Sequence, residues 1–147
     1  MLSRIAPLLI ALSLALGAAH AQESPRRLIV SVVTRNDTGS VFCGIWRGPE
    51  GFPTQRERAV GHVRDPSIVG GRAHCVFEGL APGEYAIAAF HDENANGEMD
   101  RGLFGIPTEG TGASNDARGF MAPPPYDGAK FQLGAAPLQR LTIHIGY

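Results

Sequence analysis

Lysine is almost absent from this sequence. Lys130 is the only one, and the other basic residues are arginines that stand singly or, once, in a pair. A protein that binds nucleic acid by neutralising phosphates needs a basic patch or stripe. Nucleic-acid binding is therefore not expected. The same shortage of positive charge argues against electrostatic attachment to an anionic membrane surface.

The chain also has no apolar run long enough for a membrane span, which needs roughly 20 residues. Its longest run, residues 5–18, follows Arg4 and precedes Ala19-His20-Ala21, where small residues occupy the two positions that a signal peptidase reads. We therefore expect residues 1–21 to be a cleaved signal peptide. Residues 22–147 are then a single periplasmic or secreted domain with no transmembrane segment. Loss of Arg4 leaves 13 − 1 = 12 basic against 14 acidic residues, a net charge of −2.

Cysteine is scarce, with only Cys43 and Cys75. An even count in an exported protein is typical of a disulfide, and both residues lie in strand-like segments. A bridge requires the two Cα atoms to lie within about 7 Å. The alternative is a pair of buried free thiols.

Strand signals are much stronger than helix signals. The segments rich in β-branched and alternating apolar residues are 27–35, 41–47, 72–79, 85–91, 129–134 and 138–146. We expect three hairpins, each formed by consecutive segments, and a type II turn at Pro82-Gly83 in the second of them. Residues 54–63 are compatible with a short helix or a polar connection. The predicted fold is all-β: an Ig-like or prealbumin-like antiparallel sandwich of about six to eight strands.

Residues 101–128 stand apart, because they hold six glycines and four prolines in 28 residues. Such a composition is incompatible with a regular strand or helix, so we expect one long loop. Its large apolar residues are expected to pack, and so to hold the loop against one edge of the sandwich. They are Leu103, Phe104, Ile106, Phe120, Met121 and Tyr126.

The sequence HDENANGEMD at 91–100 resembles a calcium-binding loop. Counted from Asp92, it matches D-x-[DN]-x-[DN]-G and includes the glycine that permits a sharp bend. The predicted calcium ligands are the side chains of Asp92, Asn94, Asn96 and Asp100 and the backbone carbonyl of Glu98.

Position 12 of the motif, which needs a bidentate glutamate, is Leu103. Any site is therefore expected to be weak, with a Kd of roughly 10⁻⁴–10⁻³ M, unless Glu109 folds back to supply the ligand. Two alternatives stay open. Asp, Asn and Gly also form turns that bind no metal, and another divalent ion could take the place of calcium.

Catalytic patterns are weak. Ser114, His91 and Asp92 have the residue types of a catalytic triad, but the G-x-S-x-G elbow is missing. We expect His91 to be a structural histidine at a strand end. No histidine spacing is typical of zinc. We expect no enzymatic activity. The alternative is a hydrolase that uses carboxylates of the 92–109 region.

The segment FEGLAPGEYAIAAFHDENANGEMDRGLFGIPTEGTGASNDARG (77–119), followed by PPPYDGAKFQL, resembles a bacterial exported family known as domain of unknown function 2141. The resemblance implies an exported location and a β architecture, and no activity. The shorter piece F-x-x-L-x-P-G-x-Y is similar to transthyretin-like and carboxypeptidase-regulatory sandwich modules. That similarity implies that Phe77, Leu80 and Tyr85 belong to the core.

Together these observations favour a small exported binding or structural module. The predicted contacts to a partner, either a cell-envelope protein or a small molecule, are Phe104, Glu109, Ser114, Asn115 and Tyr126. A purely structural domain with no ligand is the remaining alternative.

Overall fold

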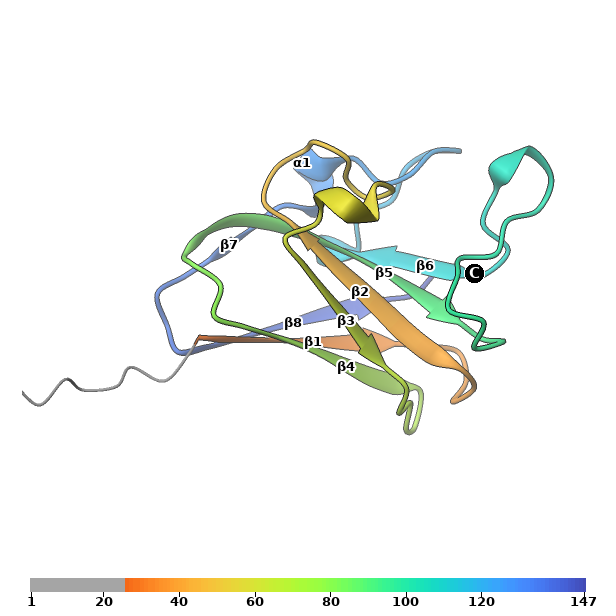
Figure 1. Ribbon diagram of the computed structural model, residues 1–147, viewed down its shortest axis with the longest axis horizontal. Coiled ribbons are helices and arrows are strands. Elements are labelled where there is room, and N and C mark those ends of the chain that lie inside the picture. Colours follow the sequence, from red (N-terminus) through yellow and green to blue (C-terminus); the bar gives the residue numbers. More distant parts are fainter. Residues whose placement is uncertain (1–25) are drawn as a thin grey trace, which may run out of the picture.

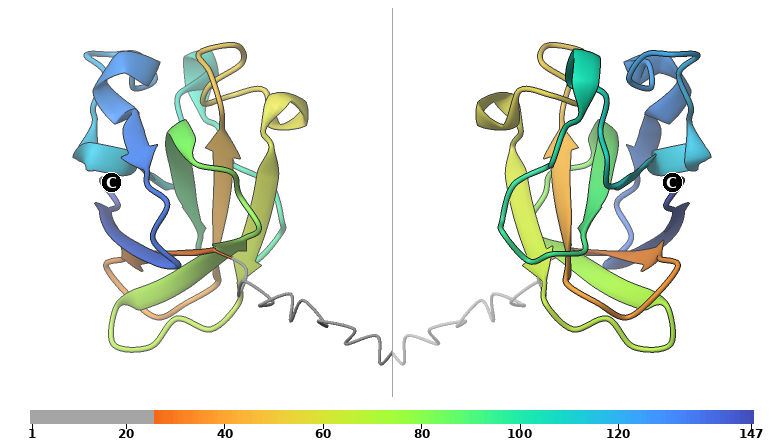
Figure 2. Two further views of the ribbon diagram at one scale, coloured as in Figure 1. Left: turned by 90° about the vertical axis from the view of Figure 1, so that its left-hand side faces the viewer. Right: turned by 90° about the vertical axis from the view of Figure 1, so that its right-hand side faces the viewer.

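Two β-sheets pack face to face, and their strand directions cross (Figures 1 and 2). The computed structural model describes residues 26–147. One sheet has the order β4-β1-β8, made of β4 (Arg72–Glu78), β1 (Arg27–Val33) and β8 (Leu138–His144). The other has the order β3-β2-β5-β6, made of β3 (Gly61–Asp65), β2 (Ser40–Trp46), β5 (Gly83–Asp92) and β6 (Gly110–Ala113). A short strand, β7 (Phe131–Leu133), pairs with the start of β5. The predicted all-β sandwich is confirmed.

The core lies between the sheets and follows the alternation of the strands. Leu28, Val30 and Val32 of β1 are buried, as are Ala73, Cys75 and Phe77 of β4 on the face that their spacing predicts. Tyr85 is buried as well, and Leu80 packs against the same cluster. The second sheet contributes Val41, Cys43, Ile45, Ile87 and Ala89.

The predicted hairpins are wrong, although the predicted strands exist. β1 pairs with β4 and β8, whereas β2 pairs with β3 and β5, so the chain crosses from one sheet to the other between β1 and β2. It crosses again between β4 and β5, where Gly83 has φ 153°, far from the value of about 80° that a type II turn requires. The β1–β8 pair is parallel, since a strand that returns from the opposite sheet is not held to the direction of a tight turn.

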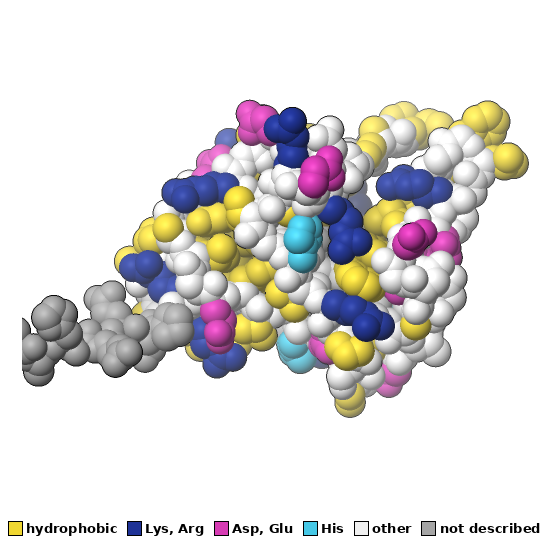
Figure 3. Space-filling model, viewed as in Figure 1, with side chains coloured by type: hydrophobic (Ala, Val, Ile, Leu, Met, Phe, Trp, Pro, Cys, Tyr) yellow, Lys and Arg dark blue, Asp and Glu magenta, His cyan; other side chains and the backbone are white. Residues whose placement is uncertain are grey.

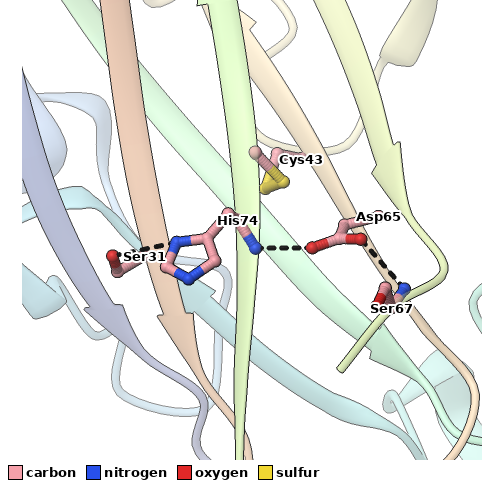
Figure 4. The surroundings of a disulfide bond; sticks show 6 residues. Ser31, Cys43, Asp65, Ser67 and His74 are labelled. Carbon is pink, nitrogen blue, oxygen red and sulfur yellow. Dashed lines mark hydrogen bonds between the residues drawn. A yellow bond between two sulfur atoms is a disulfide. The ribbon is translucent and has the colours of Figure 1, made fainter. Parts of the chain in front are cut away.

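A disulfide joins the sheets, as predicted. Cys43 of β2 and Cys75 of β4 have Cα atoms 6.4 Å apart and enclose a sequence separation of 32. Beside it, the Asp65 carboxylate accepts hydrogen bonds from the backbone N–H groups of His74 (2.6 Å) and Ser67 (2.9 Å), as Figure 4 shows. Asp65 thus connects the β3 edge of one sheet to the β4 edge of the other.

The 101–128 segment is more regular than its composition predicts. It contains β6, the 3₁₀ turns Leu103–Gly105 and Ser114–Asp116, and the short helix α1 (Tyr126–Ala129). β6 contains two glycines. At Gly110 a glycine is required, because Tyr147 and Ile145 pack where the Cβ atom of any other residue would stand. In the 54–63 region a 3₁₀ turn, Arg56–Arg58, leads into β3.

The predicted packing of the apolar residues in this segment is largely wrong. Tyr126 is buried, but Leu103, Phe104, Ile106, Phe120 and Met121 are all exposed. Residues 101–107, here called the arm, extend away from the sheets beside the C-terminus (Figure 1). The predicted signal peptide, 1–21, lies outside the described residues. Within 26–147 no helix is long and apolar enough to cross a membrane.

Candidate functional site

The 92–100 loop begins with a buried carboxylate. Asp92 is the last residue of β5, and its side chain is fully buried. The two oxygens accept hydrogen bonds from the backbone N–H groups of Asn96 (3.1 Å) and Gly97 (2.8 Å). Gly97 has φ 83°, a left-handed conformation that glycine adopts at low cost. Asp92 therefore holds the bend that the motif predicts.

Asp100 closes the loop. The side-chain amides of Asn94 (2.6 Å) and Asn96 (2.9 Å) both donate to its carboxylate. The amide oxygens accept backbone N–H groups, Asn94 from Asn96 and Asn96 from Glu98. Glu98 is exposed. The loop is thus a closed polar ring in which every predicted side-chain ligand already has a hydrogen-bond partner.

Glu109 folds back onto this loop. One of its carboxylate oxygens accepts the Glu93 N–H (3.1 Å) and the other accepts the Asp100 N–H (3.2 Å). Burial raises the pKa of the Glu109 carboxyl, and the charges of Asp92 and Asp100 raise it further, against the lowering effect of the two N–H groups. The charges of Asp92 and Asp100 therefore act on Glu109 at this end of β5.

In this conformation the side chains of the loop do not form a complete metal-binding site. Within residues 26–147, no three His, Cys, Asp or Glu side chains converge closely enough to hold an ion. The donor set nevertheless has the right chemistry, since carboxylate and amide oxygens are the ligands of a hard cation such as calcium. A carboxylate oxygen has two lone pairs, so an oxygen that accepts one N–H can still coordinate.

A second network, which the sequence reasoning missed, anchors the start of the loop. Arg35 donates two hydrogen bonds to Glu93 (2.9 and 2.6 Å), and its guanidinium lies 4.2 Å from the centroid of the Tyr147 ring. These bonds lower the pKa of Glu93. The Tyr147 hydroxyl contacts His91 Nδ1 at 2.6 Å, and His91 Nε2 lies 2.6 Å from the Thr38 carbonyl.

A carbonyl can only accept, so Nε2 of His91 carries a proton and donates it to the Thr38 carbonyl. His91 is fully buried in this network. It has the structural role that the sequence predicts. The partners lie 56 and 53 residues away in sequence, so no local pattern could have revealed them.

The other predicted contact residues lie elsewhere. Ser114 is buried; its hydroxyl accepts the Ile87 N–H (2.9 Å) and donates to the Ala129 carbonyl. The Asn115 amide donates to the carbonyls of Gly128 and Lys130. Tyr126 packs its ring against Phe52, and burial raises its pKa. Ser114 and His91 share no hydrogen bond, so the Ser/His/Asp triad is not assembled.

Comparison with known proteins gives one match. A family described as an uncharacterized protein conserved in bacteria, DUF2141, matches residues 30–140. The chain belongs to this family. Neither the curated proteins nor the solved structures contain a match to the chain.

The DUF2141 match covers all of the candidate loop and, apart from Tyr147, the network that anchors its start. The family has no assigned activity, so membership in it does not indicate what the loop does. The similarity to transthyretin-like modules stays a prediction.

Proposed function

We propose that this DUF2141 protein is an exported binding module that takes one calcium ion weakly at the 92–100 loop. The observation that carries the proposal is the position of Glu109. Its carboxylate meets the loop at Asp100, where it can replace the glutamate that the motif lacks at Leu103. The ligands are then Asp92, Asn94, Asn96, Asp100 and Glu109, with the Glu98 carbonyl.

Binding requires a small rearrangement. The amides of Asn94 and Asn96, which now donate to Asp100, must turn their oxygens toward the ion, and Asp100 is released to coordinate it. The ion then removes the repulsion between Asp92, Asp100 and Glu109, which is part of the reason that the Glu109 pKa is raised. Because the hydrogen bonds from Asn94 and Asn96 to Asp100 must break first, we expect the affinity to stay in the weak extracellular class, roughly 10⁻⁴–10⁻³ M.

The consequence of binding lies in the arm. Asp100 and Glu109 stand just outside its two ends, and the Thr108 N–H donates to the Asp100 carbonyl (2.9 Å). An ion held by both carboxylates clamps the arm at its base and sets its direction. The exported location is supported by the expected signal peptide and by the disulfide, which is a bond of oxidising compartments.

The test is the melting temperature of the processed, oxidised protein in EDTA and in rising calcium, with magnesium for comparison. A ligand at 100 times its Kd stabilises by about 2.7 kcal/mol. We expect a calcium-specific rise that Asp100→Asn abolishes. Asp100 is preferred to Asp92 for this variant because it is only half-buried, so its substitution threatens the fold less.

The matched control is Asp127→Asn, which removes a carboxylate that is 87% exposed and lies outside the loop. It should keep the calcium response. Overlapping melting curves in EDTA and calcium would instead leave the loop as a metal-free turn.

The rival is a hydrolase that uses the same carboxylates. The raised pKa of Glu109 between Asp92 and Asp100 is the one observation in its favour, because acid–base catalysts have perturbed pKa values. It predicts turnover of a general esterase, phosphatase or glycosidase substrate that Glu109→Gln abolishes while the fold survives. Our proposal predicts no turnover of any of them.

A further inference from the structure

Two projecting loops of the molecule have similar short sequences, in which Arg-Gly is followed by two large apolar residues. Residues 101–104 read Arg-Gly-Leu-Phe and residues 118–121 read Arg-Gly-Phe-Met. In each, the fourth residue has a left-handed backbone: φ is 61° at Phe104 and 50° at Met121. This conformation is unfavourable for a bulky side chain and persists where the surrounding structure imposes it.

Each of these loops exposes its apolar side chains almost completely. Leu103 is 83% and Phe104 96% exposed in the first, and Phe120 is 94% and Met121 92% exposed in the second. Ile106 adds a fifth apolar side chain to the first loop, at 61%. We call Leu103, Phe104 and Ile106 the first tip, and Phe120 and Met121 the second.

Both tips lie at the same end of the molecule. Figure 1 shows the arm and the 118–122 segment projecting at the same end of the molecule, and Figure 2 shows them set apart across its width. In Figure 3, hydrophobic side chains stand out at this end, on the upper right. The two tips thus form a two-pronged apolar surface.

The backbone beneath each tip is braced. In the arm, the Gly102 N–H donates to the Ile106 carbonyl (2.8 Å), and Arg101 donates to the Gly105 carbonyl (2.9 Å). Under the second tip, Arg118 donates to the carbonyls of Thr111 (3.2 Å) and His144 (2.9 Å). The apolar side chains are therefore held out into solvent by hydrogen-bonded loops.

We propose that the two tips insert into the headgroup–acyl boundary of a phospholipid bilayer. Exposed clusters of large apolar side chains mark sites of protein–protein or membrane interaction. Two separate convex prongs suit a fluid phase that closes around each of them, whereas a rigid protein partner would need two matching pockets. A hollow elsewhere on the surface is lined by Arg47, Gly48, Glu50, Arg58 and Val60, and three of these are charged.

The charges next to the tips fit the same partner. Arg101 and Arg118 precede the tips, are exposed, and form no ion pair within the described part of the chain. A guanidinium has five N–H donors, so each keeps donors free for a lipid phosphate after its bonds to carbonyls. Two arginines do not make a basic patch. Insertion is therefore mainly apolar and does not require anionic lipid.

The inference rests on the proposed function only in one respect: it uses the 101–128 segment as the binding surface. Calcium is not needed for it.

The experiment is co-sedimentation of the processed protein with neutral vesicles of phosphatidylcholine and phosphatidylethanolamine. Processing is verified by mass, since residues 5–18 would themselves bind lipid. We expect association in EDTA that changes little with added salt.

The decisive variants are Leu103→Ser/Phe104→Ser and Phe120→Ser/Met121→Ser. Each should lower the bound fraction about tenfold, because each removes two large apolar side chains from the lipid phase. Their melting temperatures should match that of the wild type, since these side chains contact solvent. The control is Val69→Ser, at a valine that is 71% exposed and lies outside both tips; it should bind like the wild type.

No association of the wild type, or equal association of the tip variants, would overturn the proposal. Concentration-dependent dimerisation that the tip variants abolish, without vesicle binding, would overturn it in favour of a second copy of the chain. Vesicle binding together with calcium-independent melting would retain the tips and reject the metal site, so the two proposals fail separately.

Discussion

At the scale of single residues, acidic side chains hold the candidate loop together by accepting backbone N–H groups. Asp92 holds the bend through backbone N–H groups, and Glu109 bridges Glu93 and Asp100. Glu109 has a raised pKa in the folded protein. Without metal, its contribution to stability is fully present below its unfolded pKa of about 4.3 and is lost as the pH rises through the folded value.

This pKa predicts a pH-dependent calcium response. Protons and calcium compete for Glu109, so the stabilisation by calcium should be small near pH 4.5 and should grow as the pH rises above the folded pKa of Glu109. Melting temperatures in EDTA and calcium across this range measure it. If calcium stabilised equally at pH 4.5 and 7.5, Glu109 would not be a ligand. In Glu109→Gln the pH dependence in this range should shrink.

At the scale of elements, Ser114 fills a gap in the sheet. β7 pairs with residues 83–85 of β5 and β6 with residues 88–91, which leaves Ile87 without a strand partner on that edge. The Ser114 hydroxyl accepts the Ile87 N–H and donates to the Ala129 carbonyl, so it joins β5 to the end of α1. Ser114 is therefore a structural residue.

Ser114→Ala should destabilise the fold by about 2 kcal/mol, because it leaves two buried backbone groups unpaired. This corresponds to a melting temperature lower by roughly 6–12 °C for a domain of this size. Ser67→Ala is the control, since Ser67 is exposed and only its backbone N–H bonds to Asp65. A Ser114→Ala protein as stable as the wild type would contradict this role.

Six of the eight described strands could be predicted from the sequence, whereas β3, β6 and the pairing of the strands could not. Alternation is local, so Ala73, Cys75 and Phe77 reveal their common face directly. Pairing depends on which sheet the chain enters next, and the crossing between β1 and β2 leaves no mark in the residues between them. Likewise, the Asp-x-Asn-x-Asn-Gly spacing predicted the bend at Gly97. The contact between Arg35 and Glu93, 58 residues apart, could not be predicted.

The apolar residues of the arm show a second limit. Hydrophobicity predicts burial, and it does so correctly for Tyr126, but Phe104 and Phe120 are exposed. Hydrophobicity in the sequence does not distinguish a side chain that packs inside the protein from one that is exposed on its surface. The structure shows the difference, because Tyr126 packs against Phe52 whereas Phe104 and Phe120 lie on projecting loops.

At the scale of the whole molecule, the disulfide connects the two sheets across the core. It closes a loop with a separation of 32 residues, which corresponds to about 3–4 kcal/mol in the chain-entropy model. We expect Cys43→Ala/Cys75→Ala to lose that much stability, measured by urea unfolding. Reductant should destabilise the wild type and leave the variant unchanged; a wild type indifferent to full reduction would contradict this.

The central claim is that the 92–109 region is a calcium site at the base of the arm. A calorimetric calcium titration of the processed protein tests it most directly, with Asp100→Asn and Asp127→Asn in parallel. We predict one saturable site with a Kd of roughly 10⁻⁴–10⁻³ M, lost in Asp100→Asn and kept in Asp127→Asn. No saturable binding in this range, or equal binding by Asp100→Asn, would contradict the claim and leave the loop as a turn.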